Sequence, residues 1–278
     1  MSDAFQAGYS AYYDLLYHDK DYAAEARFVA ELVRRHCGRP PAGVELLDLA
    51  CGTGRHLVEL ARLGMVVAGS DRSAAMLEQA RRNLERAGVQ AALYAHPFQT
   101  ADRIGRTFDV VTAMFSAVNY LTTDGDIASA LGAIGRLLAP GGLFIFDFWN
   151  GNAVLEGYSP VRVKDVRVEG RRLLRTGETR LDLVRHAAHV HYTVVIQEDG
   201  KVATEFTEDH HLRYYFPQEM VDLLEGHGLE VVQRCPFMHA EAEISGNEAG
   251  RESFRAARPH VFRPFTGRGR AAASAAPV

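Results

Sequence analysis

The chain is poor in cysteine and tryptophan and contains no long hydrophobic run. Its three cysteines, Cys37, Cys51 and Cys235, are odd in number and scattered, which predicts reduced thiols and a cytoplasmic protein rather than a disulfide framework. No segment approaches the ~18 apolar residues expected of a membrane span. Residues 1–10 lack the basic and then apolar pattern of a secretion signal. We therefore expect no membrane partner.

Positively charged residues are also fewer than negatively charged ones. The 31 Lys and Arg residues are outnumbered by 35 Asp and Glu, which gives a net charge of −4. A nucleic-acid-binding surface requires a basic patch, so no nucleic-acid partner is expected. Hydrophobic residues make up 47% of the 278 residues, enough to bury a sizeable core in one embellished domain or two small ones.

The most informative segment is Leu-Leu-Asp-Leu-Ala-Cys-Gly-Thr-Gly at residues 46–54. An apolar strand runs into a turn at Gly52 and Gly54, where the absence of a side chain allows the backbone to approach a ligand closely. The next strand ends at Asp71, about twenty residues after the glycine turn. This layout is typical of a nucleotide-type cofactor site, in which a carboxylate accepts hydrogen bonds from two ribose hydroxyls.

Two common nucleotide motifs are excluded. A dinucleotide fingerprint would need glycine at position 57, where this chain has Leu57, and no Gly-Lys-Ser/Thr follows for a phosphate-binding loop. The pattern therefore indicates a cofactor that contains adenosine but no pyrophosphate.

These residues resemble the glycine-rich motif of the class I S-adenosylmethionine (SAM)-dependent methyltransferases. Three further landmarks agree in order and distance: Asp71, Phe108–Val111 and Leu137–Gly142. The resemblance covers residues 10–150 well and 205–235 loosely. It implies SAM as the cofactor, a small-molecule acceptor and a seven-stranded type of Rossmann-like sheet.

Hydrophobic patterning independently predicts an α/β fold. Strands and helices alternate up to Trp149, which implies a doubly wound, mostly parallel sheet. They are expected at strand 44–49, helix 55–63, strand 65–69, helix 73–86, strands 91–95 and 108–114, helix 125–138 and strand 143–148. Residues 161–216 then alternate with period two around Asp199-Gly200, which predicts an antiparallel insertion that caps the active site.

The expected organisation has five parts. They are an N-terminal helical lid at 1–42, a SAM-binding core at 43–150, the antiparallel β insertion at 151–216, a helix and strand completing the core at 217–265, and a disordered tail at 266–278. The last strand is placed at 258–265 as an edge strand at best, because it contains two prolines. An open edge of the insertion could pair two subunits, so a homodimer is possible.

Several residues are expected to hold the cofactor. Asp71 would accept from the ribose hydroxyls, the alternative being a helix N-cap, for which Ser73 is the better candidate. Met76 would lie against the adenine or belong to the core. The segment after the third strand lacks the carboxylate common in related enzymes, so His96 or Phe98 would contact the adenine instead. The other cofactor candidates are Asp48, Ala50, Cys51, Gly52, Gly54, Arg72, Met114 and Phe115.

The segment from Tyr9 to Tyr22 resembles the lid of enzymes that N-methylate nucleotide-linked amino sugars. By that resemblance Tyr13 or Tyr17 would cover the cofactor, with Lys20 or Tyr22 near its carboxylate. The alternative is that these aromatic side chains form the lid's own core.

Methyl transfer to an amine or hydroxyl is helped by a base, and the insertion is rich in histidine. His191 or His211 is the candidate base, with Asn119 as a further proton handler. Alternatively, the histidines bind a metal or lie on a polar surface, and the surface interpretation leads, so no metal site is assigned. The acceptor-binding candidates are Asn119, Tyr120, Asp147, Trp149, Asn150, Tyr214 and Tyr215.

The predicted activity is SAM-dependent methylation of an amino or hydroxyl group on a small molecule, preferably a sugar or sugar-bearing metabolite. The alternatives are methylation of another small amine or acid, or a non-catalytic module that binds SAM. An intact glycine turn together with Asp71 argues against degeneration of the site.

Overall fold

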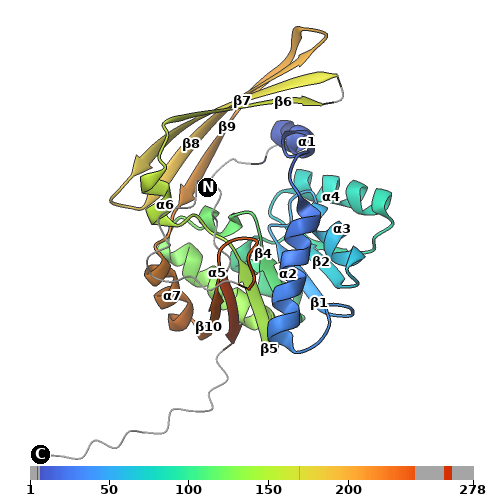
Figure 1. Cartoon of the computed structure of the whole chain (residues 1–278), viewed down its shortest axis with the longest axis vertical. Helices are drawn as coiled ribbons and strands as arrows, with labels where there is room; N and C mark the ends of the chain where they lie inside the picture. The colour runs from blue at the N-terminus through green and yellow to red at the C-terminus, as the bar shows by residue number, and fades with distance from the viewer. Residues whose placement is uncertain (1–4, 6, 169, 242–259, 265–278) are drawn as a thin grey trace, which may run out of the picture.

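The computed structural model describes residues 5, 7–168, 170–241 and 260–264 (Figure 1). The central sheet contains β1 (Glu45–Leu49), β2 (Val66–Ser70), β3 (Ala92–Tyr94), β4 (Phe108–Ala113), β5 (Leu138–Phe146), β10 (Leu229–Arg234) and β11 (His260–Pro264). Its helices are α2 (Tyr22–Cys37), α3 (Arg55–Arg62), α4 (Ala74–Ala87), η1 (Phe98–Ile104), η2 (Ala117–Tyr120), α5 (Asp124–Leu137), α6 (Gly151–Glu156) and α7 (Pro217–Gly226). The lid helix α1 (Ala7–Leu16) and strands β6 (Val161–Val168), β7 (Arg171–Asp182), β8 (Ala187–Glu198) and β9 (Lys201–Arg213) complete the chain.

The central sheet has seven strands in the order β10-β11-β5-β4-β1-β2-β3. The five strands from β3 to β5 are parallel, whereas β11 runs antiparallel to both of its neighbours. The predicted doubly wound, mostly parallel α/β fold is therefore confirmed. The order reverses between β1 and β4, and ligands bind beyond the carboxyl ends of strands at such a switch point.

Helices cover both faces of this sheet because successive strand residues are apolar on both sides. Leu46 and Val110 pack with α2, α3 and α4 on one face. Leu47 and Val111 pack with η1, α5 and α7 on the other. Two helical layers and their sheet thus form a rigid platform below the carboxyl ends of the strands.

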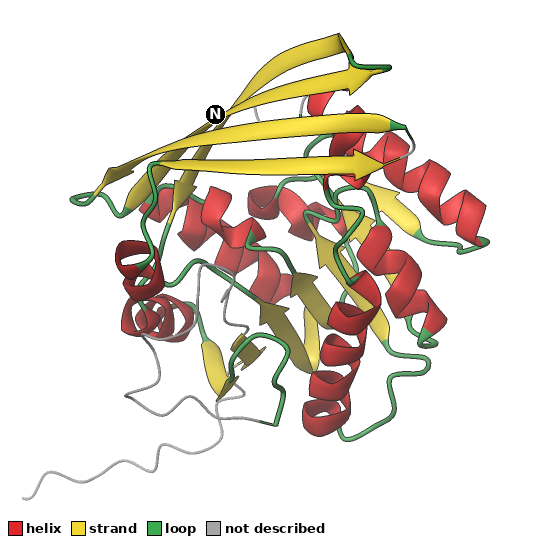
Figure 2. Ribbon diagram, turned by 45° about the horizontal axis from the view of Figure 1, so that its top comes forward, coloured by secondary structure: helices red, strands yellow, loops and turns green. Residues whose placement is uncertain are grey.

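A second sheet, in the order β6-β7-β8-β9, lies over that end of the platform with α1 beneath it (Figure 2). All of its neighbours are antiparallel, and β8 and β9 are joined by the predicted turn at Asp199 and Gly200, both of which have positive φ. The apolar side of the sheet faces α1: Val194 and Leu173 pack with Tyr9 and Leu16. This four-stranded sheet is called the cap below.

The last strand corrects one expectation. The segment around 258–265 does supply a strand, but β11 lies inside the sheet between β5 and β10, not at an edge. Pro264 is the final residue of β11, so the strand interior keeps its backbone donors. The predicted disordered tail at 266–278 lies outside the described residues.

The C-terminal end of α5 and the start of β5 also differ from expectation. The helix ends at Leu137, and Leu138 already pairs with Phe108, so Pro140 lies within β5 next to a register shift. The short helices η1, η2 and α6 were not predicted. Each has at most seven residues, too few for a helical hydrophobic period to stand out.

Glycine 69 in β2 allows close packing beneath the glycine turn. A Cβ at this position would lie 2.8 Å from both Cys51 Sγ and Leu57 Cδ1. Gly69→Ala should therefore destabilise the protein by about 1–3 kcal/mol through overpacking, measured by urea unfolding. In the matched control, Gly135→Ala in α5, an added Cβ meets nothing within 4 Å, so about 0.5–1 kcal/mol of stabilisation is expected. Equal effects at the two sites would contradict this account.

Candidate functional site

The glycine turn between β1 and α3 is held by the carboxylate of Asp71. Asp71 Oδ2 accepts from the backbone N–H of Gly52 at 2.9 Å, and Oδ1 accepts from that of Ser73 at 2.8 Å. Ser73 is the N-cap of α4, as expected, because its hydroxyl accepts from Met76 N. Asp71 thus joins the ends of β1 and β2.

These contacts leave room for a ribose. Each carboxylate oxygen has two lone-pair directions, so one remains on each oxygen for a hydroxyl. Gly52 has φ of 54° and nothing within 4 Å of the position that a Cβ would occupy, so the turn is open to a ligand. Burial raises the pKa of Asp71, while the two backbone hydrogen bonds act in the opposite direction.

Two more carboxylates, Asp48 and Asp147, lie at the carboxyl ends of β1 and β5, the two strands on either side of β4. Asp48 Oδ1 accepts from Thr112 Oγ1 at 2.7 Å, and burial raises the pKa of Asp48 to about 6. Asp147 Oδ2 accepts from the N–H and hydroxyl of Ser116, while its Oδ1 is buried with no partner among the described residues. An unpartnered buried oxygen at the carboxyl edge of the sheet fits a site that accepts a polar ligand group.

The lid helix α1 is tied to the glycine turn through Asp14. Its two carboxylate oxygens accept from Thr53 Oγ1 at 2.7 Å and from Asn83 Nδ2 at 2.8 Å. Just beyond the helix, Lys20 pairs with Glu25, which also contacts His56 Nε2 at 2.6 Å. The lid is therefore positioned by buried polar contacts as well as by its aromatic side chains.

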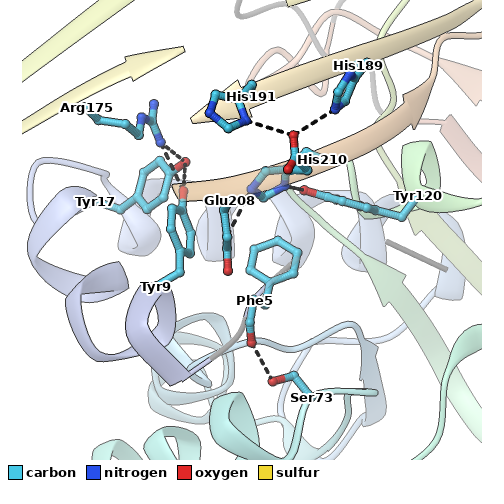
Figure 3. A network of polar contacts seen from close by, with 11 residues as sticks. Phe5, Tyr9, Tyr17, Ser73, Tyr120, Arg175, His189, His191, Glu208 and His210 are labelled. Carbon is cyan, nitrogen blue, oxygen red and sulfur yellow. Dashed lines mark hydrogen bonds and ion pairs between the residues drawn. The ribbon is translucent and has the colours of Figure 1, made fainter. Parts of the chain in front are cut away.

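Aromatic side chains pack together between the lid, η2 and the cap, and this region is called the chamber below. The ring of Phe5 lies within 5.4–6.2 Å, centroid to centroid, of four other rings: Tyr9, Tyr13, Tyr120 and His210. Figure 3 shows Phe5 beside Tyr120 and His210, and its carbonyl accepts from Ser73 Oγ at 3.0 Å. The chamber therefore adjoins the Asp71 turn.

A chain of polar contacts links Tyr120, which follows β4, to His210 and Glu208 on the cap. Tyr120 Oη lies 2.6 Å from His210 Nδ1, and His210 Nε2 lies 3.1 Å from Glu208 Oε2. His210 is 2% exposed and Glu208 is 5% exposed, so the pair is shielded from solvent. Tyr120 was predicted as an acceptor contact, whereas Glu208 and His210 were missed.

The histidines that were predicted as bases lie on the opposite face of the cap. His191 and His189 both contact Asp209 Oδ1 at 2.9 Å, and the ring of His211 stacks on His189. This group is partly exposed and points away from the chamber (Figure 3). The structure thus places His191 and His211 on the partly exposed face of the cap, as the surface alternative expects, and a role of either as the base stays a prediction.

The inward-pointing face of β9 could have been predicted from the apolar residues that share it. Residues i and i+2 of a strand point the same way. His210 shares its side with Leu212 and, across the strand pair, with Val190, and those two side chains are buried. His210 lies on the same face as these apolar residues and therefore points inward. The more numerous histidines, His189, His191 and His211, lie on the opposite face.

Asn119 is a structural link and not a proton handler. Its amide nitrogen donates to Arg213 O and its amide oxygen accepts from Trp149 N at 3.1 Å, so both ends are used. The side chain is fully buried. It joins η2, the end of β9 and the segment after β5, which positions the neighbouring Tyr120.

The other predicted acceptor contacts divide into two groups. Trp149 packs with Tyr120 and the inner face of the cap. Asn150 caps α6, and Tyr215 is fully buried with its hydroxyl on Leu121 O, so both support the fold. Tyr214 is also buried, with its hydroxyl unpartnered among the described residues.

The remaining cofactor candidates are also placed. Phe115 is 42% exposed at the end of β4, where Tyr17 packs against its edge, and Arg72 lies over the Tyr120 ring. The carbonyl of His96 accepts from Ser70 Oγ at 2.8 Å. Burial raises the pKa of Cys51 well above its usual range, as for a packing residue. Three further candidates are buried in or against the core: Met76, Phe98 and Met114.

Comparison with known proteins identifies the family. A family described as "Methyltransferase domain" matches residues 46–142. The chain is 32% identical to dTDP-3-amino-3,4,6-trideoxy-alpha-D-glucopyranose N,N-dimethyltransferase of Streptomyces venezuelae, over 82% of this chain and 92% of that protein. The chain belongs to the SAM-dependent methyltransferases.

Solved structures agree with this methyltransferase assignment. Streptomyces venezuelae DesVI matches with a TM-score of 0.74 and 29% identity over 92% of this chain and 98% of that one. SAM-bound CalS10, an amino pentose methyltransferase from Micromonospora echinaspora, matches with a TM-score of 0.70 and 26% identity over 95% of this chain and 99% of that one.

A second relative in sequence is dTDP-3-amino-3,6-dideoxy-alpha-D-glucopyranose N,N-dimethyltransferase of Streptomyces fradiae, 32% identical over 81% of this chain and 87% of that protein.

The enzyme uses SAM, and the residues around the glycine turn fit that cofactor. Asp71 would hold the ribose, and the open backbone at Gly52 would lie against the methionine part. SAM supplies an electrophilic methyl group, so the protein's task is to align the acceptor and exclude water. In the described part of the methyltransferase, no group of His, Cys, Asp and Glu is arranged to hold a metal ion, and no helix has the length and apolarity of a membrane span.

Removal of the Asp71 carboxylate should weaken SAM binding. Asp71→Ala loses acceptors for the ribose hydroxyls, each hydrogen bond to a charged group contributing about 1.5–3 kcal/mol, so the Kd should rise at least tenfold. Calorimetric titration with SAM measures this. The control is Glu59→Ala at a half-buried position of α3, where the carboxylate contacts only Arg62 among the described residues. Unchanged affinity in Asp71→Ala would show that the cofactor is held elsewhere.

The buried Asp147 should make stability depend on pH. Burial raises its pKa to about 6, and the nearby Glu25 acts in the same direction, against a usual value of 3.8. The folded state therefore binds a proton near pH 6 that the unfolded state does not bind, so this group favours folding as the pH falls from 7 to 5. In the parent, this group should increase the free energy of unfolding as the pH falls from 7 to 5. Asp147→Asn should reduce that increase by about 1 kcal/mol, measured by urea unfolding at both pH values.

The control for this measurement is Asp222→Asn, which changes an exposed carboxylate on α7. Its stability should change with pH as that of the parent does. If Asp147→Asn shows the same pH dependence as the parent, Asp147 does not titrate in this range.

Proposed function

We propose that this methyltransferase transfers a methyl group to the amino group of a nucleotide-linked sugar. The observation that carries the proposal is a partly buried cation in the chamber that has no carboxylate partner among the described residues. Two relatives that cover most of the chain are named as N,N-dimethyltransferases of dTDP-linked amino sugars, which supports the same acceptor class.

The cation is Arg175, on the inner face of β7. Its Nη1 donates to the hydroxyls of Tyr17 at 2.8 Å and Tyr9 at 3.1 Å (Figure 3). Its guanidinium lies over the ring of Tyr192. Among the described residues no carboxylate pairs with it. A buried guanidinium is stabilised by an anion, and its planar fork suits phosphate oxygens.

Two further basic residues extend this charge toward the edge of the cap. Lys164 lies directly opposite Arg175 in the antiparallel pair, and Arg162 lies opposite Gly177. Paired residues point to the same face, so all three belong to the inner face. Lys164 donates to Asp19 at 2.9 Å, and together with Arg175 it gives this face a basic character that suits a diphosphate.

The acceptor test measures S-adenosylhomocysteine release with three compounds. These are a nucleotide-linked amino sugar, its hydroxyl counterpart and the free amino sugar. Turnover is expected with the first and much less with the other two, because one lacks the amine and the other the anionic group. Turnover of the hydroxyl compound alone would overturn the proposal.

The charge of Arg175 should strengthen binding of the acceptor and leave binding of SAM unchanged. Arg175→Met is expected to raise the KM for the nucleotide-linked sugar at least tenfold, since hydrogen bonds to charged groups contribute about 1.5–3 kcal/mol, while the Kd of SAM stays within about twofold. The matched control is Arg180→Met, at an exposed position of the same strand on the other face. A weakened SAM affinity in Arg175→Met would assign Arg175 to the cofactor carboxylate instead.

A dimer through the cap is a separate proposal. β6 is an edge strand of the cap sheet and exposes Val161 and Val163. Edge strands of this kind can pair between copies. Sedimentation equilibrium at micromolar concentration tests it, and a monomer mass would rule it out.

A further inference from the structure

We infer that Tyr120, His210 and Glu208 form a proton relay that removes the proton from the acceptor ammonium before methyl transfer. This inference rests on the proposed amine acceptor. An ammonium has no lone pair with which to attack, so one N–H bond must break first.

The hydrogen-bond directions favour transfer away from Tyr120. Glu208 accepts at His210 Nε2, which makes Nε2 the nitrogen that carries the hydrogen. His210 Nδ1 then carries the lone pair and accepts from the Tyr120 hydroxyl at 2.6 Å. The phenol oxygen keeps a lone pair to accept a hydrogen bond from the ammonium.

The transfer balances without forming a free tyrosinate. The ammonium N–H bond breaks as an O–H bond forms on Tyr120, while the original Tyr120 O–H bond breaks and an N–H bond forms on His210 Nδ1. The products are a neutral amine, a neutral Tyr120 and an imidazolium that the Glu208 carboxylate stabilises. Burial raises the pKa of Tyr120 well above its usual range, which is consistent with a phenol that passes on a proton and does not retain a negative charge.

The other groups around His210 do not replace this route. Tyr192 on β8 contacts its ring edge at 4.9 Å between centroids, Tyr9 on α1 at 5.7 Å and Phe5 at 5.4 Å. Arg175 lies beyond Tyr192, and Arg72 lies over the Tyr120 ring. Of the carboxylates near His210, Glu208 is the one in hydrogen-bond contact with the imidazole.

Tyr120 lies at the end of the chamber that is nearest to the cofactor turn, as this role requires. Its ring lies 5.8 Å from the guanidinium of Arg72, the residue after Asp71, and it follows Phe115 along the segment beyond β4. Tyr120 thus adjoins the cofactor turn, while Glu208 lies on the cap. By this assignment Tyr120 is the catalytic residue, and His210 and Glu208 act through it.

The relay predicts a pH signature. In Tyr120→Phe and His210→Gln, kcat at pH 7 should fall at least tenfold, and activity should return toward that of the parent as the pH rises to about 9.5, where the amine loses its proton to solvent. The SAM Kd should stay unchanged, which shows that the variants fold. Tyr120→Phe keeps the ring and removes only the hydroxyl, so packing is preserved.

The control is His189→Gln on the outer face of β8, which should keep the activity and pH profile of the parent. A loss of kcat that is equal at all pH values, or no loss, would overturn the relay. So would a loss in His191→Gln with none in His210→Gln. If the parent itself turns over only the hydroxyl sugar, the proposed function has failed, which is a distinct result.

A second measurement does not depend on the acceptor. In the SAM-bound enzyme labelled with ¹⁵N-histidine, the two ring-nitrogen shifts of His210 report its tautomer. The relay requires hydrogen on Nε2 and a lone pair on Nδ1, and Glu208→Gln should shift this equilibrium. Hydrogen on Nδ1 would mean that His210 donates to Tyr120 and cannot take its proton, which would overturn the inference.

Discussion

The two hydrogen bonds to Asp71 are the constraint on which the site depends. Without this carboxylate, the backbone N–H groups of Gly52 and Ser73 would lose the partner that holds the turn after β1 against the start of α4. A buried charged acceptor with two donors is stable and well oriented. The same atoms that organise the turn are those that would receive the ribose, so the site is preformed.

The cap adds a second surface above that preformed turn. Among the described residues its strands pair only with one another, and α1 packs below it, joined to the turn through Asp14. Methyl transfer is an in-line displacement, to which a protein contributes mainly by orienting the acceptor and excluding water. The polar groups of the chamber, Arg175, Glu208, His210 and Tyr120, come from the cap and from η2.

Much of the core was predictable because local and global signals agree there. The glycine turn, Asp71 and the alternation of strands and helices each indicate the same fold, and they extend over contiguous segments. The position of β11 was not predictable in the same way. Its prolines argued for an edge, but Pro264 is the last residue of β11 and does not interrupt it, and the place of β11 between β5 and β10 is set by two distant partners.

The cofactor turn was determined by the sequence itself, because a strand, two glycines and a carboxylate twenty residues later can be arranged in few ways. The acceptor chamber was decided only by tertiary structure. Period two placed His189 and His191 on one face of their strand and His211 on the face opposite to His210 on the next, and the apolar neighbours Val190 and Leu212 mark the buried side. It did not give the register between the two strands or the side chains of the lid that His210 would meet. Moving a strand by one residue exchanges the two sets, and packing against Tyr9 and Tyr120 selects His210.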